Sequence, residues 1–346
     1  MRTASGEAPA GGAAQGACAG HGQGEFVAPR WLANPHLQSI LPSVQPRRSL
    51  VVRRARPLLA ASRDLLLDCG ERVRLFGHYA PQPGAVRGLV LMLHGWEGSA
   101  ESIYVLSAAA HLYARGFEIF RLNLRDHGPT HHLNPEIFHS CRIAEVVGAV
   151  RAVQELWPDR PLSLVGYSLG GNFALRVALR APAAGIRLRQ VVAVCPVLDP
   201  EHTLAALDHG LWLYRSYFVR KWRSSLLMKH AAWPDLYDRD ELMQRRDLTR
   251  MTEQLVLRYT DFPDLESYLR GYAIVGEVLA PLAVPARIIS ALDDPIIPAS
   301  DLARLAPSRC LELTTTRQGG HCGYLERLGG ESWADREILA TLSAAA

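Results

Sequence analysis

The sequence predicts an α/β fold, in which a mainly parallel, doubly wound sheet carries an inserted helical cap. Short apolar runs alternate with longer helical stretches from Leu65 onward, as expected for strand–helix alternation. Several of these runs are apolar without interruption, which is typical of strands buried on both faces of a parallel sheet. The alternation breaks between Asp199 and Gly271, where the pattern is helical throughout.

The expected elements follow from this alternation. Strands are predicted at Val73–Tyr79, Gly88–Leu93, Glu118–Leu124, Leu162–Gly166, Gln190–Cys195, Arg287–Ala291 and Cys310–Thr314. Helices are predicted at Ser102–Arg115, Cys141–Trp157, Leu169–Arg180 and Trp333–Ser343. The chain then divides into a disordered tail (1–25), an N-terminal arm (26–64), a first core part (65–198), the helical cap (199–271) and a second core part (272–346). The arm is rich in Pro and Arg and is expected to be an irregular segment on the domain surface.

Composition excludes several classes of protein. A chain of 346 residues that is 48% apolar can bury a core without disulfides or a structural metal. A net charge of +4 is too small to predict nucleic-acid binding. Six scattered cysteines without a CxxC pair favour reduced thiols in a cytoplasmic enzyme. The first 25 residues lack the apolar stretch of a secretory signal, and no run of about 18 apolar residues predicts a membrane span.

The strongest chemical signal is the Gly166-Tyr-Ser168-Leu-Gly170 sequence, which follows a predicted strand and precedes a predicted helix. A sharp strand-to-helix turn of this kind holds a serine hydroxyl above the sheet as a nucleophile. The helix that follows directs N–H groups and a positive dipole end at developing negative charge. Ser168 is therefore the predicted nucleophile, although a glycine-rich turn without chemistry is the alternative.

A second signal is the His94-Gly-Trp96-Glu-Gly sequence at the end of the predicted strand Gly88–Leu93. Hydrolases that use a serine place part of their oxyanion hole in such a loop. The predicted donors are the backbone N–H groups of Trp96 and Leu169. His94 is expected to hold this loop by hydrogen bonds rather than to act as the general base.

Two further loops supply a general base and an acid. The predicted strand Arg287–Ala291 delivers Asp293 and Asp294 to a proline-bounded loop, where a carboxylate can orient a catalytic imidazole. Asp294 is the preferred acid because it directly precedes Pro295, and Asp293 stays the alternative. His321 lies in a glycine-rich loop near the C-terminus and is the predicted general base. Ser168, Asp294 and His321 occur in the order that this class of hydrolase uses.

Four stretches together resemble the YheT-like branch of the α/β hydrolases, which are serine enzymes of the esterase or lipase type. They are Trp31–Ser39, His94–Gly98, Gly166–Asn172 and Asp293–Pro295. The Asn34-Pro-His-Leu-Gln sequence is the most specific part, because generic hydrolases lack it. The resemblance implies an α/β-hydrolase fold and acyl-ester substrates, and it supports Ser168, Asp294 and His321 as the triad. The branch usually has an Arg-Gly-Cys-rich loop where this chain has 123–132.

That departing loop raises a rival chemistry, because imidazole and carboxylate groups are ligands for zinc or iron. The candidate ligands are Asp126, His127, His131, His132 and His139. Their spacing does not match a His-x-His-x-Asp-His metallohydrolase, so solvated loop histidines and N-cap partners are the favoured interpretation. We therefore expect neither a metal nor a cofactor.

The sequence of the inserted cap is compatible with several roles. Its Leu211–Trp222 run mixes aromatic and basic residues, and on a helix it would present an apolar face edged by Arg and Lys. Such a face could pack on the core, line an acyl pocket, for example with Trp212 and Phe218, or contact a membrane surface weakly.

The sequence thus predicts a serine hydrolase that cleaves small-molecule acyl esters or lipids through an acyl-enzyme intermediate. The open alternatives are acyl transfer or amidase action on the same triad, and a non-catalytic binding protein of the same fold. No nucleic-acid partner is expected, and the oligomeric state stays open.

Overall fold

A computed structural model describes residues 21–23, 26–244 and 247–344 of the chain. Within these residues nine strands form one sheet in the order β1-β9-β8-β7-β6-β4-β5-β3-β2. The strands are β1 His21–Gln23, β2 Arg63–Asp68, β3 Arg74–Ala80, β4 Gly88–Leu93, β5 Phe117–Leu122, β6 Leu162–Tyr167, β7 Leu188–Val194, β8 Ala286–Ala291 and β9 Leu311–Thr316. Among the strand pairs of the described residues, only β2–β3 and β3–β5 are antiparallel. The predicted mainly parallel sheet is confirmed.

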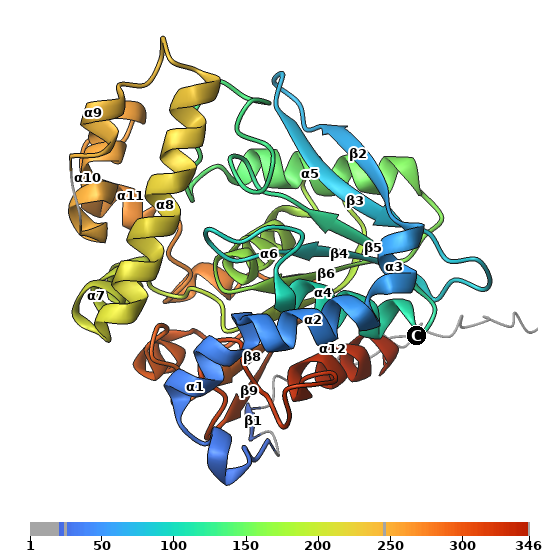
Figure 1. Cartoon of the computed structure of the whole chain (residues 1–346). Coiled ribbons are helices and arrows are strands. Elements are labelled where there is room, and N and C mark those ends of the chain that lie inside the picture. The colour runs from blue at the N-terminus through green and yellow to red at the C-terminus, as the bar shows by residue number, and fades with distance from the viewer. Residues whose placement is uncertain (1–20, 24–25, 245–246, 345–346) are drawn as a thin grey trace, which may run out of the picture.

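Helices cover both faces of this sheet (Figure 1). They are α1 Pro35–Ile40, α2 Gln45–Arg54, α3 Arg56–Ala61, α4 Ile103–Tyr113, α5 Ile143–Leu156, α6 Leu169–Arg180, α7 Pro200–His209, α8 Trp212–Ala232, α9 Arg239–Leu242, α10 Leu248–Tyr259, α11 Leu265–Arg270 and α12 Trp333–Ala344. Four 3₁₀ turns join them, at Arg30–Leu32, Leu41–Ser43, Glu277–Leu279 and Ala299–Arg304. No helix of the described residues has the length and apolarity needed to cross a membrane.

The central strand β4 shows how the apolar runs build two cores. All six of its residues are buried. Leu89, Leu91 and Leu93 pack into the core that α5 and α6 cover, whereas Val90 and Met92 pack into the core of α4 and α12. A strand whose alternate residues feed two apolar layers has no polar face, which explains its uninterrupted apolar sequence.

The N-terminal arm differs from the prediction, because it is mainly helical rather than irregular. Three of its five prolines, Pro35, Pro46 and Pro57, lie in the first turns of α1, α2 and α3, where a missing N–H breaks no hydrogen bond. Asn34 caps α1 by accepting hydrogen bonds from the N–H groups of His36 and Leu37. The strand β2 follows at once and had no counterpart in the predicted strands. Most of the predicted tail (1–25) lies outside the described residues, but His21–Gln23 form β1 and pair with β9.

Helices α7 to α11 lie between β7 and β8 in the chain and gather at one end of the sheet (Figure 1). The fully buried Asn172 holds the two ends of this insertion together, because its Nδ2 donates to the carbonyls of Val197 and Tyr272 at 2.9 and 2.8 Å. The N–H of Ile274 also donates to the carbonyl of Leu198. The predicted helical cap is therefore confirmed, and the helix that follows Ser168 holds the two ends of the cap together.

The packing of α5 on the sheet yields a stability prediction. A methyl group added at Gly148 would lie 2.0 Å from the carbonyl oxygen of Cys69, so Gly148→Ala must push α5 away from the backbone after β2. Overpacking of this kind costs about 1–3 kcal/mol. The matched control is Gly84→Ala, whose methyl group meets no heavy atom within 4 Å. Urea unfolding should show a lower midpoint for Gly148→Ala only, and equal midpoints would contradict this packing.

Candidate active site

Ser168 lies at the sharp turn between β6 and α6, with φ of +52° and ψ of −120°. An L-residue rarely adopts this conformation, which costs of the order of 1–3 kcal/mol and persists only where the surroundings enforce it. The flanking glycines allow the turn to close. A Cβ at Gly166 would lie 2.2 Å from the carbonyl oxygen of Gly170, and one at Gly170 would lie 2.4 Å from that of His94. The N–H of Ser168 donates to the carbonyl of Val194 on the neighbouring strand.

The structure brings three of the predicted site residues together. His321 Nε2 lies 3.0 Å from Ser168 Oγ, and His321 Nδ1 lies 2.8 Å from Asp294 Oδ2. The second oxygen of Asp294 accepts the N–H groups of Ile296 and Ile297 at 2.8 and 3.0 Å. A carboxylate held in this way orients the imidazole so that Nδ1 donates to Asp294 and Nε2 is free to accept a proton from the serine.

The electrostatics of His321 suit a base. Burial lowers the pKa of His321, but the charge of Asp294 and its hydrogen bond raise it by more, so that the pKa lies above the usual histidine value. The imidazolium that forms when the ring takes a proton is thereby stabilised.

Asp293, the alternative acid, has a different contact. Its Oδ1 accepts the N–H of Gly320 at 2.9 Å, one residue before His321. Asp293 therefore holds the backbone of the histidine loop, and Asp294 holds the imidazole itself.

The N-terminal arm positions the same loop, a role that the sequence analysis did not assign to it. Ser39 Oγ accepts the N–H of His321 at 2.8 Å. The buried Gln38 exchanges two hydrogen bonds with the backbone of Leu325, at 3.0 and 2.8 Å. A Cβ at Gly323 would lie 2.1 Å from the carbonyl oxygen of Gln38. A Cβ at Gly320 would lie 2.5 Å from the carbonyl oxygen of Pro35. The glycines of the loop thus allow contact with the arm.

The loop after β4 lies against the serine, since a Cβ at Gly95 would be 3.2 Å from Ser168 Cβ. Among the described residues, the N–H of Gly95 donates to Tyr104 Oη and that of Glu97 donates to His127 Nε2, whereas the N–H of Trp96 donates to no other group. Leu169 is the first residue of α6, where N–H groups have no partner within the helix. Neither predicted oxyanion donor is thus occupied by another group of the described residues.

Two buried histidines brace this loop. His94 Nδ1 donates to the carbonyl of Gly95 while its Nε2 accepts the N–H of Leu124, and burial lowers the pKa of His94 to about 4. His127 likewise bonds the carbonyl of Arg125 through Nδ1 and the N–H of Glu97 through Nε2, and burial lowers its pKa well below the usual value. Both rings stay neutral and join the loop after β4 to the loop after β5.

Of the histidines in the departing loop, His127 braces backbone groups and His131 contacts the cap, whereas His132 is exposed. His131 Nε2 lies 2.9 Å from Ser225 Oγ on α8, and burial lowers the pKa of His131 to about 4. Asp126 Oδ1 pairs with the buried Lys229 of α8 at 2.9 Å. Within the described residues, the side chains of Asp126, His127, His131, His132 and His139 form no group with metal-ligand spacing.

The cap contacts the site through Trp96. Its indole stacks on Phe218 at 5.2 Å between ring centroids and meets Trp222 edge-on at 5.0 Å. A small cavity of about 10 Å³ is lined by Trp222 together with Glu97 and Lys229. Trp212, at the start of α8, is 62% exposed and lies outside this contact. Of the two aromatic residues expected to line a pocket, Phe218 alone reaches the predicted oxyanion loop in this way.

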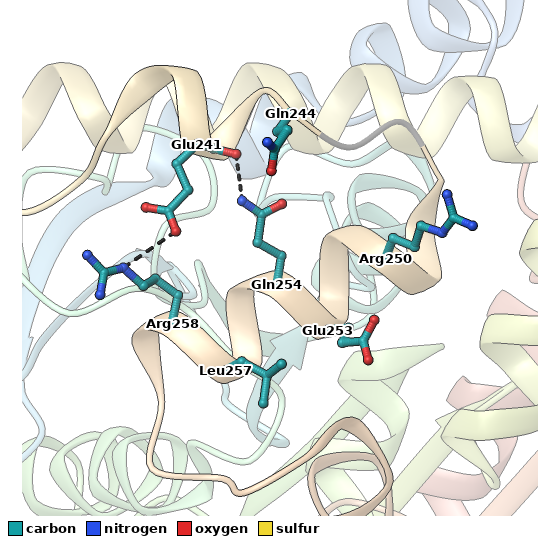
Figure 2. A pocket seen from close by; sticks show the side chains of 7 residues that line it. All are labelled: Glu241, Gln244, Arg250, Glu253, Gln254, Leu257 and Arg258. Carbon is teal, nitrogen blue, oxygen red and sulfur yellow. Dashed lines mark hydrogen bonds and ion pairs between the residues drawn. The ribbon is translucent and has the colours of Figure 1, made fainter.

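A polar hollow on the cap, between α9 and α10, is not part of the site. Figure 2 shows its lining, in which Gln254 Nε2 donates to the carbonyl of Glu241 at 2.7 Å and Arg258 pairs with the carboxylate of Glu241 at 3.4 Å. None of the predicted site residues lines it.

Comparison with known proteins agrees with this geometry. A family model described as the alpha/beta hydrolase fold matches residues 88–328. YheT of Escherichia coli (strain K12), an esterase by its given name, is 25% identical over 322 residues, which cover 91% of this chain and 92% of YheT. The monoacylglycerol lipase ABHD2 of Danio rerio is 23% identical over 266 residues, or 71% of this chain and 62% of the lipase.

A solved structure supports the fold alone. The esterase Pf2001 of Pyrococcus furiosus superposes with a TM-score of 0.51 at 15% identity, covering 75% of this chain and 84% of that protein. The alignment with YheT shows that the resemblance to the YheT-like branch is not limited to four short stretches but extends over most of the chain.

Proposed function

The chain belongs to the α/β-hydrolase fold family, and on this premise we propose that it cleaves carboxylic esters with Ser168 as the nucleophile. The observation that carries the proposal is the line of contacts from Ser168 Oγ to His321 Nε2 and from His321 Nδ1 to Asp294, at 3.0 and 2.8 Å. The names of the two curated relatives, an esterase and a monoacylglycerol lipase, support an acyl ester or lipid as the substrate.

The proposed reaction has two halves. His321 Nε2 takes the proton of Ser168 while Oγ attacks the acyl carbon, and the protonated ring then gives this proton to the leaving alcohol. Water, deprotonated by His321, then attacks the acyl-enzyme, and the protonated ring returns this proton to Ser168 Oγ as the bond between Oγ and the acyl carbon breaks and the carboxylic acid leaves. The Asp294 carboxylate stabilises the imidazolium in both halves.

The tetrahedral oxyanion of each half needs donors that are in place before the reaction. The N–H groups of Trp96 and Leu169 fit this role, because Trp96 follows Gly95, which packs on Ser168, Leu169 follows Ser168 in the chain, and neither N–H has a partner among the described residues. His94 and His127 fix the Trp96 loop by four hydrogen bonds to backbone groups. A rigid donor costs no reorganisation when charge develops.

Ser168→Ala tests the nucleophile. The variant should lose labelling by a fluorophosphonate probe, and hydrolysis of p-nitrophenyl esters should fall by about 10⁴-fold or more, because the remaining groups cannot form an acyl-enzyme. Its thermal unfolding should stay within a few degrees of wild type. Near wild-type turnover in a clean preparation would refute the assignment.

Asp294→Asn and Asp293→Asn form a matched pair that tests the acid. A neutral His321 is the active form, and its pKa is raised, so wild-type kcat/KM should fall with decreasing pH around a midpoint above about 6.5. Asp294→Asn should lower the rate by about 10⁴-fold and move this midpoint to lower pH, because the raising charge is gone. Asp293→Asn should keep the midpoint. A shift in the Asp293 variant alone would exchange the two roles.

Phe218→Ala tests whether the cap sets acyl preference. Each methylene bound on apolar surface contributes up to about 0.8 kcal/mol, or roughly fourfold, so loss of the ring should lower kcat/KM for octanoyl esters several-fold more than for acetyl esters. Trp212→Ala is the control, because that side chain points into solvent. Equal octanoyl-to-acetyl ratios in wild type and Phe218→Ala would make the cap contact structural only.

A further inference from the structure

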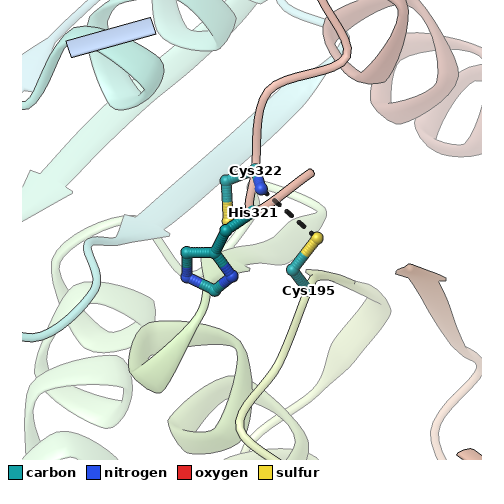
Figure 3. A group of neighbouring side chains, drawn as sticks. All are labelled: Cys195, His321 and Cys322. Carbon is teal, nitrogen blue, oxygen red and sulfur yellow. Dashed lines mark hydrogen bonds between the residues drawn. The ribbon is translucent and has the colours of Figure 1, made fainter. Parts of the chain in front are cut away.

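Two thiols lie directly behind the proposed catalytic histidine, and the mechanism uses neither. Cys195 follows β7 and Cys322 follows His321 in the chain, so the cluster joins two loops (Figure 3). A sulfur of each cysteine and a ring nitrogen of His321 all lie within 4.8 Å of one another. The N–H of Cys322 donates to Cys195 Sγ at 3.4 Å, which keeps the two loops in contact.

The backbone at both thiols is unusual. Cys195 has φ of +45° and Cys322 has φ of +59°, a backbone region that residues other than glycine rarely adopt. The sulfurs have weak contacts to give up. Cys195 Sγ lies 3.4 Å from Tyr324 Oη and 3.8 Å from the carbonyl of Gly320, and Cys322 Sγ lies 3.7 Å from the carbonyl of Val194. Strained positions of this kind cluster at ligand-binding and catalytic sites.

We propose that Cys195, Cys322 and His321 form a binding site for a thiophilic divalent cation of the zinc type. Two thiolates and one imidazole are three of the four ligands that tetrahedral Zn²⁺ takes, with solvent as the fourth. Zn–S and Zn–N bonds of about 2.3 and 2.0 Å place such ligand atoms roughly 3.5–3.8 Å apart, so the present cluster needs to contract by only about 1 Å.

The chemistry of binding balances without a redox partner. Each thiol releases one proton to solvent as its sulfur bonds to the cation, and the two thiolates neutralise the charge of Zn²⁺. The neighbouring Asp294 carboxylate adds further negative charge near the site. Cys195 is buried, whereas Ser168, His321 and Cys322 are each partly exposed, so the cation enters from the side where Ser168 is accessible.

Cation binding and catalysis exclude one another. His321 has two ring nitrogens, and these contact Ser168 and Asp294. A cation takes one of them, which removes either the base from the serine or the carboxylate from the imidazole. This consequence rests on the proposed esterase function, but the binding itself does not.

Binding is tested first, without substrate, on the full chain reduced with a phosphine and freed of any tag. Equilibrium dialysis against ZnCl₂ should give one site, and CoCl₂ should give a thiolate-to-cobalt charge-transfer band. Cys322→Ala and Cys195→Ala should each weaken zinc binding by at least about 10- to 100-fold. Loss of a group that only hydrogen-bonds a metal ligand already costs this much. Cys310→Ala, at the opposite end of the sheet, should bind as wild type. Should Cys195→Ala not fold, the half-buried Cys322→Ala decides alone.

Inhibition is tested second, with p-nitrophenyl acetate and each variant's own zinc-free rate as reference. ZnCl₂ should inhibit the wild type and Cys310→Ala, a chelator should restore the rate, and Cys322→Ala should need at least about tenfold more zinc. Binding that is unchanged in both cysteine variants, or a wild type that binds no zinc, would overturn the site. Inhibition that only a reductant reverses would also overturn it, because thiol oxidation would then be the cause. Zinc binding in a chain without esterase activity would leave the site standing and refute the proposed function.

Discussion

The turn at Ser168 is the constraint on which the rest of the structure depends. Its backbone can close only because Gly166 and Gly170 let carbonyl oxygens approach to within about 2.5 Å of where a Cβ would be. The strain at Ser168 must be offset elsewhere, and the buried strands β4 and β7 on either side of β6 provide this, since they hold the turn from both sides. The position of the Ser168 side chain is thereby fixed by the sheet and the turn, independently of the other parts of the site.

Three segments far apart in the sequence then converge on the serine. They are the N-terminal arm, the His321 loop and the Trp96 loop, and each is held by hydrogen bonds to backbone atoms. The arm fixes the His321 loop through Ser39 and Gln38, and two neutral histidines fix the Trp96 loop. A buried imidazole is well suited to this task because one nitrogen donates and the other accepts. Protonation would remove the accepting nitrogen, and burial makes protonation unfavourable, so these braces persist across the pH range in which His321 titrates.

Local patterns made the sheet and the turn predictable from the sequence, whereas tertiary contacts decided the rest. The apolar run of β4 and the Gly-x-Ser-x-Gly sequence carry their structural meaning within a few residues. The arm was predicted as irregular because of its proline content, although Pro35, Pro46 and Pro57 each occupy the first turn of a helix. The sequence also left Asp293 and Asp294 as alternatives, because adjacent carboxylates in one loop differ only in what they face after folding.

The histidine loop joins the proposed catalysis to the thiol cluster. Gly320 and Gly323 contact the arm too closely to carry side chains, so only His321 and Cys322 project from the four-residue turn. The positive φ of Cys322 sends its sulfur toward Val194 and Cys195, while the His321 ring meets Ser168. Adjacent residues on one short, tightly packed turn cannot move independently. A bond made at Cys322 therefore also shifts His321, so the packing that positions the proposed base makes it sensitive to a ligand on the neighbouring residue.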